Sequence, residues 1–159
     1  MEKRTILAAV VAEMRNELAL LNRAADDARS GATDSEVQSE SKYDTRGLES
    51  SYLARGHAMK FEALAADVAV LEGLDLTDHK SGDPIVVGTL VGVDMGGETM
   101  LFFVLPKGGG IEVEVDGVKG EITVVTPESP MGGRLMGLKE GDTFSLNKGQ
   151  AASKVVSTD

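Results

Sequence analysis

Apolar residues recur with alternating steps of four and three along the first part of the chain. In residues 3–32 they form one seam, which consists of Leu7, Val11, Met14, Leu18, Leu21, Ala25 and Ala28. This spacing is typical of a helix that packs lengthwise against a second helix in a coiled coil. The sequence therefore predicts a first helix of about 28 residues, roughly 40 Å long at 1.5 Å per residue.

Residues 48–72 repeat the pattern. Their seam consists of Ala54, His57, Phe61, Leu64, Val68 and Leu71, and Gly73 follows as a helix-ending residue. Two such helices in succession predict an antiparallel helical hairpin. His57 is interpreted as a packed histidine of the helix interface, because the only other histidine, His79, lies in the predicted linker and two histidines so placed do not form a metal site.

The segment between the two seams is polar. Gly31 interrupts the first pattern, and the run Thr33 to Glu36 has the order of a helix-starting capping box. The first helix is therefore expected either to end near residue 32 or to break and restart before Tyr43. A flexible polar linker over residues 33–47 is the alternative.

From Pro84 onward the hydrophobic period changes to two, which predicts strands. Expected strands cover 85–93, 99–105 (buried on both faces), 111–115, 121–126 and 143–146, with a last edge strand at 154–157. Asp116-Gly117 gives a hairpin signal, and a short helix is expected from Ser129-Pro130 to Met136, ended by Gly137. The predicted fold class is α+β: an N-terminal antiparallel two-helix coiled-coil hairpin in residues 1–76, a linker in 77–83, and a small, mainly antiparallel β domain with one short helix in 84–159.

Charge and composition narrow the function classes. The 159-residue chain has 16 Lys and Arg against 26 Asp and Glu, a formal net charge of −10, which disfavours nucleic-acid binding through phosphate contacts. The acidity fits a partner with a basic surface or a metal, although its commonest meaning is solubility. The absence of cysteine excludes disulfides and thiolate metal sites. The start is too mixed for a signal peptide or a membrane span, so a cytoplasmic protein is expected.

Two segments resemble a known family. Residues 125–142, with Ser129-Pro130, Leu135-Met136-Gly137 and Gly141-Asp142, are similar to the C-terminal signature of the GreA/GreB transcript cleavage factors. Residues 43–54, which begin Tyr43-Asp44-Thr45-Arg46, resemble the acidic turn of that family's N-terminal coiled coil. The order of the parts also agrees, and the resemblance implies an FKBP-like β domain.

The resemblance also implies a mechanism. In this family the β domain docks at the rim of the secondary channel of bacterial RNA polymerase and the coiled coil passes down it. Carboxylates at the tip then help to hold a second Mg²⁺ in the polymerase active site, which stimulates the polymerase's own hydrolysis of backtracked RNA. The resemblance assigns this role to Asp44 and, as the second carboxylate, Glu49.

The protein is accordingly expected to be an accessory elongation factor and not an enzyme. It would have no intrinsic cofactor, contact nascent RNA only indirectly, bind no membrane and be a monomer. The residues expected to bind the polymerase are Tyr43, Arg46, Ser129, Pro130, Arg134 and Lys139.

Departures from the family pattern keep other functions open. Asp44 and Glu49 lie five residues apart, whereas the family places its two acids three apart, and Gly47 stands where the second acid would fall. In the signature, Gly133 replaces a common Arg and Leu138 a usual Lys. A secondary-channel regulator without cleavage activity is therefore an alternative, and a structural adaptor with a dimerising hairpin is another. Prolyl isomerase activity is disfavoured, because residues 83–159 contain no Trp or Tyr to line a proline pocket.

Overall fold

The computed structural model describes residues 3–38, 46–147, 149 and 151–159, with side chains described except at residues 25, 28–38, 46–54 and 57. The elements in chain order are α1 (Lys3–Gln38), α2 (Arg46–Glu72), β1 (Leu90–Met95), β2 (Glu98–Val104), β3 (Glu112–Val113), β4 (Ile122–Val125), α3 (Pro130–Leu135), β5 (Thr143–Phe144) and β6 (Ser153–Thr158). The chain forms two compact units. The hairpin unit is Met14–Val68, and the β unit combines Met1–Glu13 with Ala69–Asp159.

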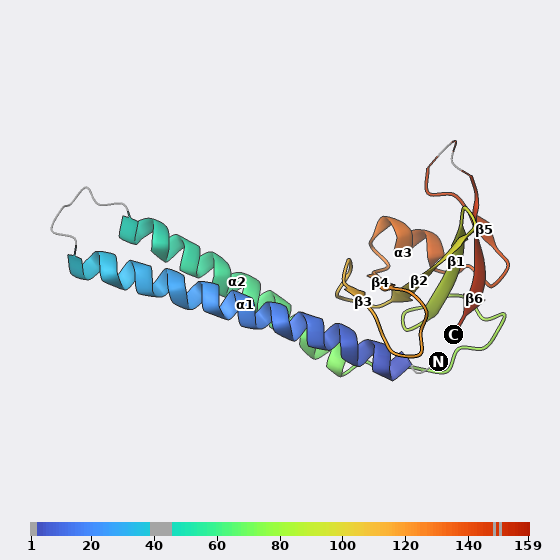
Figure 1. Cartoon of the computed structure of the whole chain (residues 1–159), viewed down its shortest axis with the longest axis horizontal. Helices are drawn as coiled ribbons and strands as arrows, with labels where there is room; N and C mark the ends of the chain where they lie inside the picture. The colour runs from blue at the N-terminus through green and yellow to red at the C-terminus, as the bar shows by residue number, and fades with distance from the viewer. Residues whose placement is uncertain (1–2, 39–45, 148, 150) are drawn as a thin grey trace. The chain divides into compact units, whose positions relative to one another are not determined.

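The hairpin unit contains most of α1 and α2, which lie side by side and run in opposite directions (Figure 1). Met14 and Val68 are buried, and Leu18, Leu21, Phe61 and Leu64 are half-buried along the same seam. The predicted antiparallel hairpin is therefore confirmed. No helix in the described part of the chain is long and apolar enough to span a bilayer.

The first helix is longer than the sequence pattern predicts. α1 continues without interruption to Gln38, so the predicted break at Gly31 and the capping box at Thr33 to Glu36 are wrong. A glycine in a helix interior costs only about 1 kcal/mol relative to alanine. Restarting a helix would require a second unfavourable nucleation, which exceeds that cost.

The buried face at the start of α1 is also displaced from the predicted seam. Ile6 and Val10 are fully buried, whereas Leu7 and Val11 are only half-buried. Residues 1–13 belong to the β unit and not to the hairpin unit. The start of α1 therefore buries the face that carries Ile6 and Val10 within the β unit. A one-residue shift rotates the buried face by about 100°.

The β unit is built on a six-stranded sheet in the order β3-β4-β2-β1-β6-β5. Neighbouring strands are antiparallel except β2 and β4, which are parallel, so the predicted mainly antiparallel sheet is confirmed. The prediction of β6 as an edge strand is wrong, because β6 lies between β1 and β5 and its Val155 is buried opposite Val93. Position at the end of the chain does not determine position in the sheet.

The first two strands differ from their predicted bounds. β1 starts at Leu90 and not at Ile85, because Gly88 has a positive φ of 96° and the Thr89 hydroxyl accepts a hydrogen bond from the Val86 N–H at 3.1 Å, which forms a turn. β2 is buried only in its second half, over residues 102–104, while its first three residues are exposed. The prediction that this strand is buried on both faces is therefore right for half of its length.

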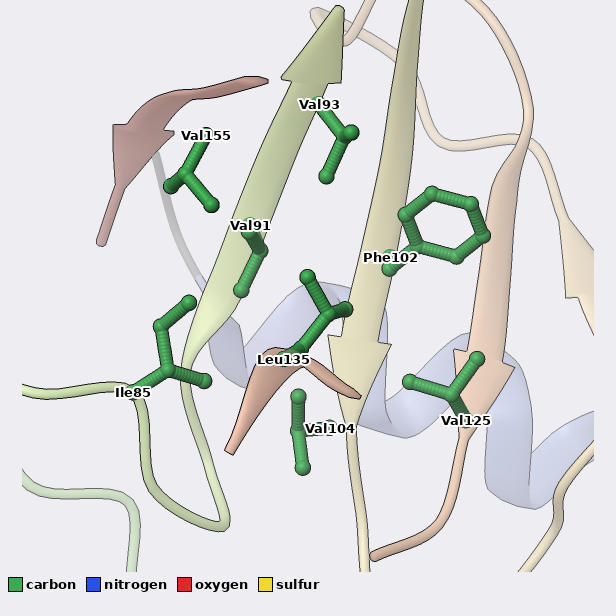
Figure 2. Packing of buried hydrophobic residues seen from close by; sticks show 8 residues of the cluster. All are labelled: Ile85, Val91, Val93, Phe102, Val104, Val125, Leu135 and Val155. Atoms are coloured by element: carbon green, nitrogen blue, oxygen red, sulfur yellow. The ribbon is translucent and has the colours of Figure 1, made fainter. Parts of the chain in front are cut away.

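Both faces of the sheet are covered. Figure 2 shows the cluster on one face, where Leu135 of α3 lies over the strands; its members are Ile85, Val91, Val93, Phe102, Val104, Val125, Leu135 and Val155. Because side chains alternate along a strand, Leu90, Phe103 and Val124 point to the opposite face, and they are buried as well. The same unit contains the buried Ile6 and Val10 of α1, so helical residues belong to the β unit's core.

The segment between α2 and β1 is held by specific hydrogen bonds. The Lys3 ammonium donates to the Thr77 carbonyl at 2.9 Å and to the Gly88 carbonyl at 3.0 Å. Further along, the Ile85 N–H donates to the Leu138 carbonyl at 2.7 Å. The first residues of α1 and the loop after α3 are thus both bonded to this segment within the β unit.

Candidate partner-binding surface

The signature segment folds into a capped helix that follows β4. Ser129 is the N-cap of α3: its hydroxyl accepts a hydrogen bond from the Gly132 N–H at 3.0 Å and donates one to the Thr126 carbonyl at 2.7 Å. Pro130 occupies the first helical position, where its missing N–H removes no helical bond. The helix predicted from Ser129-Pro130 is therefore confirmed.

Gly132 is fixed by close packing. A Cβ atom at this position would overlap severely with the carbonyl group of Thr126. Backbone atoms cannot move aside as the end of a flexible side chain can. Only glycine therefore allows α3 to approach the end of β4 this closely.

The loop after α3 is held from both sides. Leu135 is fully buried in the core cluster, and Gly137, with a φ of 82°, ends the helix and donates a hydrogen bond to the Ile85 carbonyl at 2.9 Å. Further along, the Lys139 N–H donates to the Asp142 carboxylate at 2.8 Å. Hydrogen bonds and core packing therefore fix the backbone of the segment that carries Arg134 and Lys139.

The predicted partner-binding residues of the β unit take different positions. Pro130, Arg134 and Lys139 are exposed to solvent, with Arg134 in the last turn of α3. Ser129 is half-buried, and its hydroxyl is engaged in the cap. The structure thus places two exposed cations on one short segment, α3 and the turn after it, whereas the hydroxyl of Ser129 has an internal role.

The predicted tip residues lie at the edge of what the structure describes. Tyr43 and Asp44 lie outside the described residues. Arg46 and Glu49 belong to the first turn of α2, and their side chains are not among those that the structure describes. The roles of Asp44 and Glu49 as metal-holding carboxylates therefore stay predictions. Among the described side chains, no group of three or more His, Asp or Glu could hold a metal ion.

The structure also reveals an acidic group that the sequence reading did not single out. A side-chain hydrogen bond with Glu112 and the charge of Glu112 raise the pKa of Glu121 above the usual range of a glutamate, and slight desolvation and the charge of Glu114 act in the same direction. An open hollow of about 470 Å³ beside it is lined by Glu114, Val115, Asp116, Gly117, Val118 and Gly120. The alternation of Glu112 and Glu114 before a hairpin turn, with Glu121 after it, is the signal that could have predicted this group.

Comparison with known proteins gives matches among solved structures. No family model matches the chain, and no curated protein matches it. The crystal structure of GreA factor homolog 1 (Gfh1) of Thermus thermophilus is 22% identical with a TM-score of 0.38, and the comparison covers 95% of each chain. Thermus aquaticus Gfh1 is also 22% identical, with a TM-score of 0.37 over 95% of this chain and 94% of that one.

A further structure of the transcription factor Gfh1 has 22% identity and a TM-score of 0.36, over 94% of this chain and 93% of the other. At this level of identity the likeness concerns the fold alone. Each of the three comparisons covers nearly the whole of this chain.

Proposed function

We propose that this protein is a transcription factor that binds RNA polymerase at its secondary channel and stimulates cleavage of backtracked RNA. The observation that carries the proposal is the antiparallel hairpin of α1 and α2, whose connecting residues 39–45 include Asp44 and whose second helix carries Glu49 in its first turn. An elongated hairpin with acidic residues at its connection suits insertion into a narrow channel. The sequence resemblance to GreA/GreB factors supplies the partner.

The length of the helices supports this role. α1 has 36 residues and α2 has 27. At 1.5 Å per residue these helices are about 54 Å and 40 Å long, which is longer than a typical globular helix. Among the described side chains of the hairpin unit, only Met14 and Val68 are buried, so this part of the unit has no large core of its own. Insertion of the hairpin into the polymerase channel accounts for this length.

The surface around α3 is the proposed docking site on the polymerase. Its exposed cations, Arg134 and Lys139, are mounted on a backbone fixed by the Ser129 cap and by the close approach of Gly132. Charged groups of this kind steer association and fix orientation more than they add affinity. Replacing either cation by glutamate should weaken polymerase binding. A loss of roughly 1.4 kcal/mol in binding free energy corresponds to an increase of about tenfold in Kd.

The chemistry of the proposed tip rests on its oxygen donors. Carboxylates are hard ligands that suit Mg²⁺, which binds through one or two carboxylates together with phosphates and water. Bound with the polymerase's own ion, such a metal supplies an activated water and neutralises charge on the scissile phosphate. In this proposal Asp44 and Glu49 position that ion, and the polymerase carries out the hydrolysis.

The test is an assay on halted, backtracked polymerase. Adding the wild-type protein should shorten the RNA, and the Asp44→Asn or Glu49→Gln variant should bind the polymerase but fail to shorten it. Glu62→Gln, which removes an exposed carboxylate from the same helix far from its start, is the matched control and should behave as the wild type. Loss of shortening in this control as well would contradict the assignment to the tip.

The five-residue spacing of Asp44 and Glu49 favours one second candidate, a secondary-channel regulator that does not support cleavage. Residues five apart do not share a face of a regular helix, so convergence of the two carboxylates requires an irregular turn. Polymerase binding without shortening by the wild type would select this candidate. Absence of binding, together with a concentration-dependent dimer in sedimentation, would overturn both and favour an adaptor.

A further inference from the structure

Methionines border the core cluster of the β unit. On β1, Val91, Val93 and Met95 share one face, and on β2, Val104, Phe102 and Met100 do so, because alternate residues of a strand point the same way. Met100 pairs directly with Val93, so both rows lie on the same side of the sheet. Each row thus begins in the buried core and ends in a methionine.

The helical side of the cluster has the same border. Met131 and Met136 of the α3 segment flank the buried Leu135, and both are half-buried against the cluster, as is Met95. α3 has only six residues, so it covers only a limited part of the sheet. We define Met95, Met100, Met131 and Met136 as the methionine rim. It contains four of the seven methionines of a chain that has no cysteine.

Met100 is the accessible member of the rim. It is 43% exposed, whereas the other three members are half-buried and packed against the cluster. More than half of its surface is still covered, and it lies directly opposite Val93, which is fully buried. Solvent can therefore reach Met100, and a more polar side chain at this position would lie next to a buried core residue.

We propose that the methionine rim is an oxidant-sensitive modification site and that Met100 is its entry point. The co-reactant is a peroxide. The Met100 sulfur attacks one peroxide oxygen, an S–O bond forms as the O–O bond breaks, and the thioether loses two electrons to become a sulfoxide while the peroxide is reduced to water. A sulfoxide is polar and accepts hydrogen bonds, so its partial burial beside Val93 destabilises the β unit.

Met59 provides an internal comparison. It is 65% exposed on α2 in the hairpin unit, on the side away from the half-buried seam residues Phe61 and Leu64. Its sulfur is more accessible than that of Met100, but its environment is solvent. Oxidation of Met59 should therefore be at least as fast as that of Met100 and should leave the stability of the protein unchanged.

The experiment treats the full chain with hydrogen peroxide, locates sulfoxides by peptide mass spectrometry and follows thermal unfolding. We expect Met59 and Met100 to be oxidised before Met95, Met131 and Met136, and the buried Met14 last. The Tm of the wild type should fall by about 4 °C. Methionine sulfoxide reductases should restore it.

Matched variants separate the positions. The Tm of Met59→Leu should fall on oxidation as that of the wild type does. Met100→Leu conserves the volume of the side chain, and its Tm should not fall when the exposed methionines are oxidised. Met100→Gln, a polar side chain of similar length, should show a lowered Tm without any oxidant. An equal loss in Met100→Leu, an unchanged Tm in Met100→Gln, or oxidation of Met100 after the half-buried rim members would overturn the proposal.

Discussion

The hairpin unit and the β unit are stabilised in different ways. In the β unit both faces of the sheet are covered, and Phe103, Ile122 and Leu135 are among its fully buried side chains. In the hairpin unit, Met14 and Val68 are the buried hydrophobic residues among the described side chains, and the other seam residues with described side chains, Leu18, Leu21, Phe61 and Leu64, are half-buried. The β unit has a hydrophobic core on the two covered faces of its sheet, and the described part of the hairpin unit has a single line of contacts between two helices.

This difference shows that the boundary between the units is not a boundary between helices and strands. Ile6 and Val10 lie in α1 but belong to the β unit, and Leu71 near the end of α2 is fully buried in the same unit. The start of α1 and the end of α2 therefore contribute to the stability of the β unit. Variants can be chosen to break or sharpen this comparison.

The largest effect is expected at Ile6. Ile6→Ala removes a fully buried side chain from a helical residue of the β unit and should lower the free energy of unfolding by about 3 kcal/mol. Urea unfolding followed by amide NMR signals of β1 and β2 measures this loss. Leu7→Ala, at the half-buried neighbouring position, should cost about 1 kcal/mol. Equal effects at the two positions would contradict the assignment of Ile6 to the β core.

The next effect concerns the hairpin unit alone. Leu18→Asp places a charge in the half-buried seam and should destabilise the hairpin by about 2 kcal/mol, with loss of helical circular dichroism and with the NMR signals of the β strands retained. Leu20→Asp introduces the same charge on the same helix at a site that is 63% exposed, and it should leave the spectrum unchanged. Unaltered helicity in Leu18→Asp would argue against the paired seam.

A smaller effect is expected at the cap of α3. Ser129→Ala removes the acceptor of the Gly132 N–H and should cost about 1 kcal/mol in urea unfolding. Ser129→Thr retains a hydroxyl and should recover most of that stability. If Ser129→Ala weakened polymerase binding without any loss of stability, Ser129 would act as a contact residue and not as a cap.

The smallest effect is a pH dependence at Glu121. Its pKa is raised chiefly by Glu112, so the protonated form is favoured in the folded state and its stabilising contribution is lost as the pH rises through the raised pKa. Glu121→Gln keeps a neutral side chain at every pH. Its unfolding midpoint should equal that of the wild type near about pH 4, close to the usual glutamate range, and exceed it at about pH 7. Glu114→Gln should give a weaker version, and a wild-type advantage at neutral pH would contradict this sign.

Local patterns predicted the elements well where one physical signal dominates. The seam from Phe61 to Leu71 and the Ser129-Pro130 helix start are determined by periodicity and by capping, which act over a few residues. The burial of Ile6 in place of Leu7, and the inner position of β6, depend on contacts between segments far apart in the chain. No local pattern contains that information. The continuation of α1 through Gly31 shows that one helix breaker does not outweigh the cooperativity of a long helix.

The candidate site was predictable to a different extent in its two parts. The exposure of Arg134 and Lys139 follows from their charge and from the turn residues around them, so the sequence could indicate it. Convergence of Asp44 and Glu49 depends on the path of the chain through residues 39–45, which five-residue spacing alone does not determine. The internal engagement of the Ser129 hydroxyl could be predicted from its position before Pro130, since that is where an N-cap residue stands.

The central claim is that the connection between α1 and α2 reaches the polymerase active site. A photoreactive cross-linker at position 44, in a complex with halted, backtracked polymerase, tests this most directly, with the same group at exposed Lys154 of β6 as the reference position. We expect position 44 to cross-link to the 3′ segment of the RNA or to the catalytic loops around it, and position 154 to give no such product. Cross-links from position 44 confined to the outer surface of the polymerase would contradict the account.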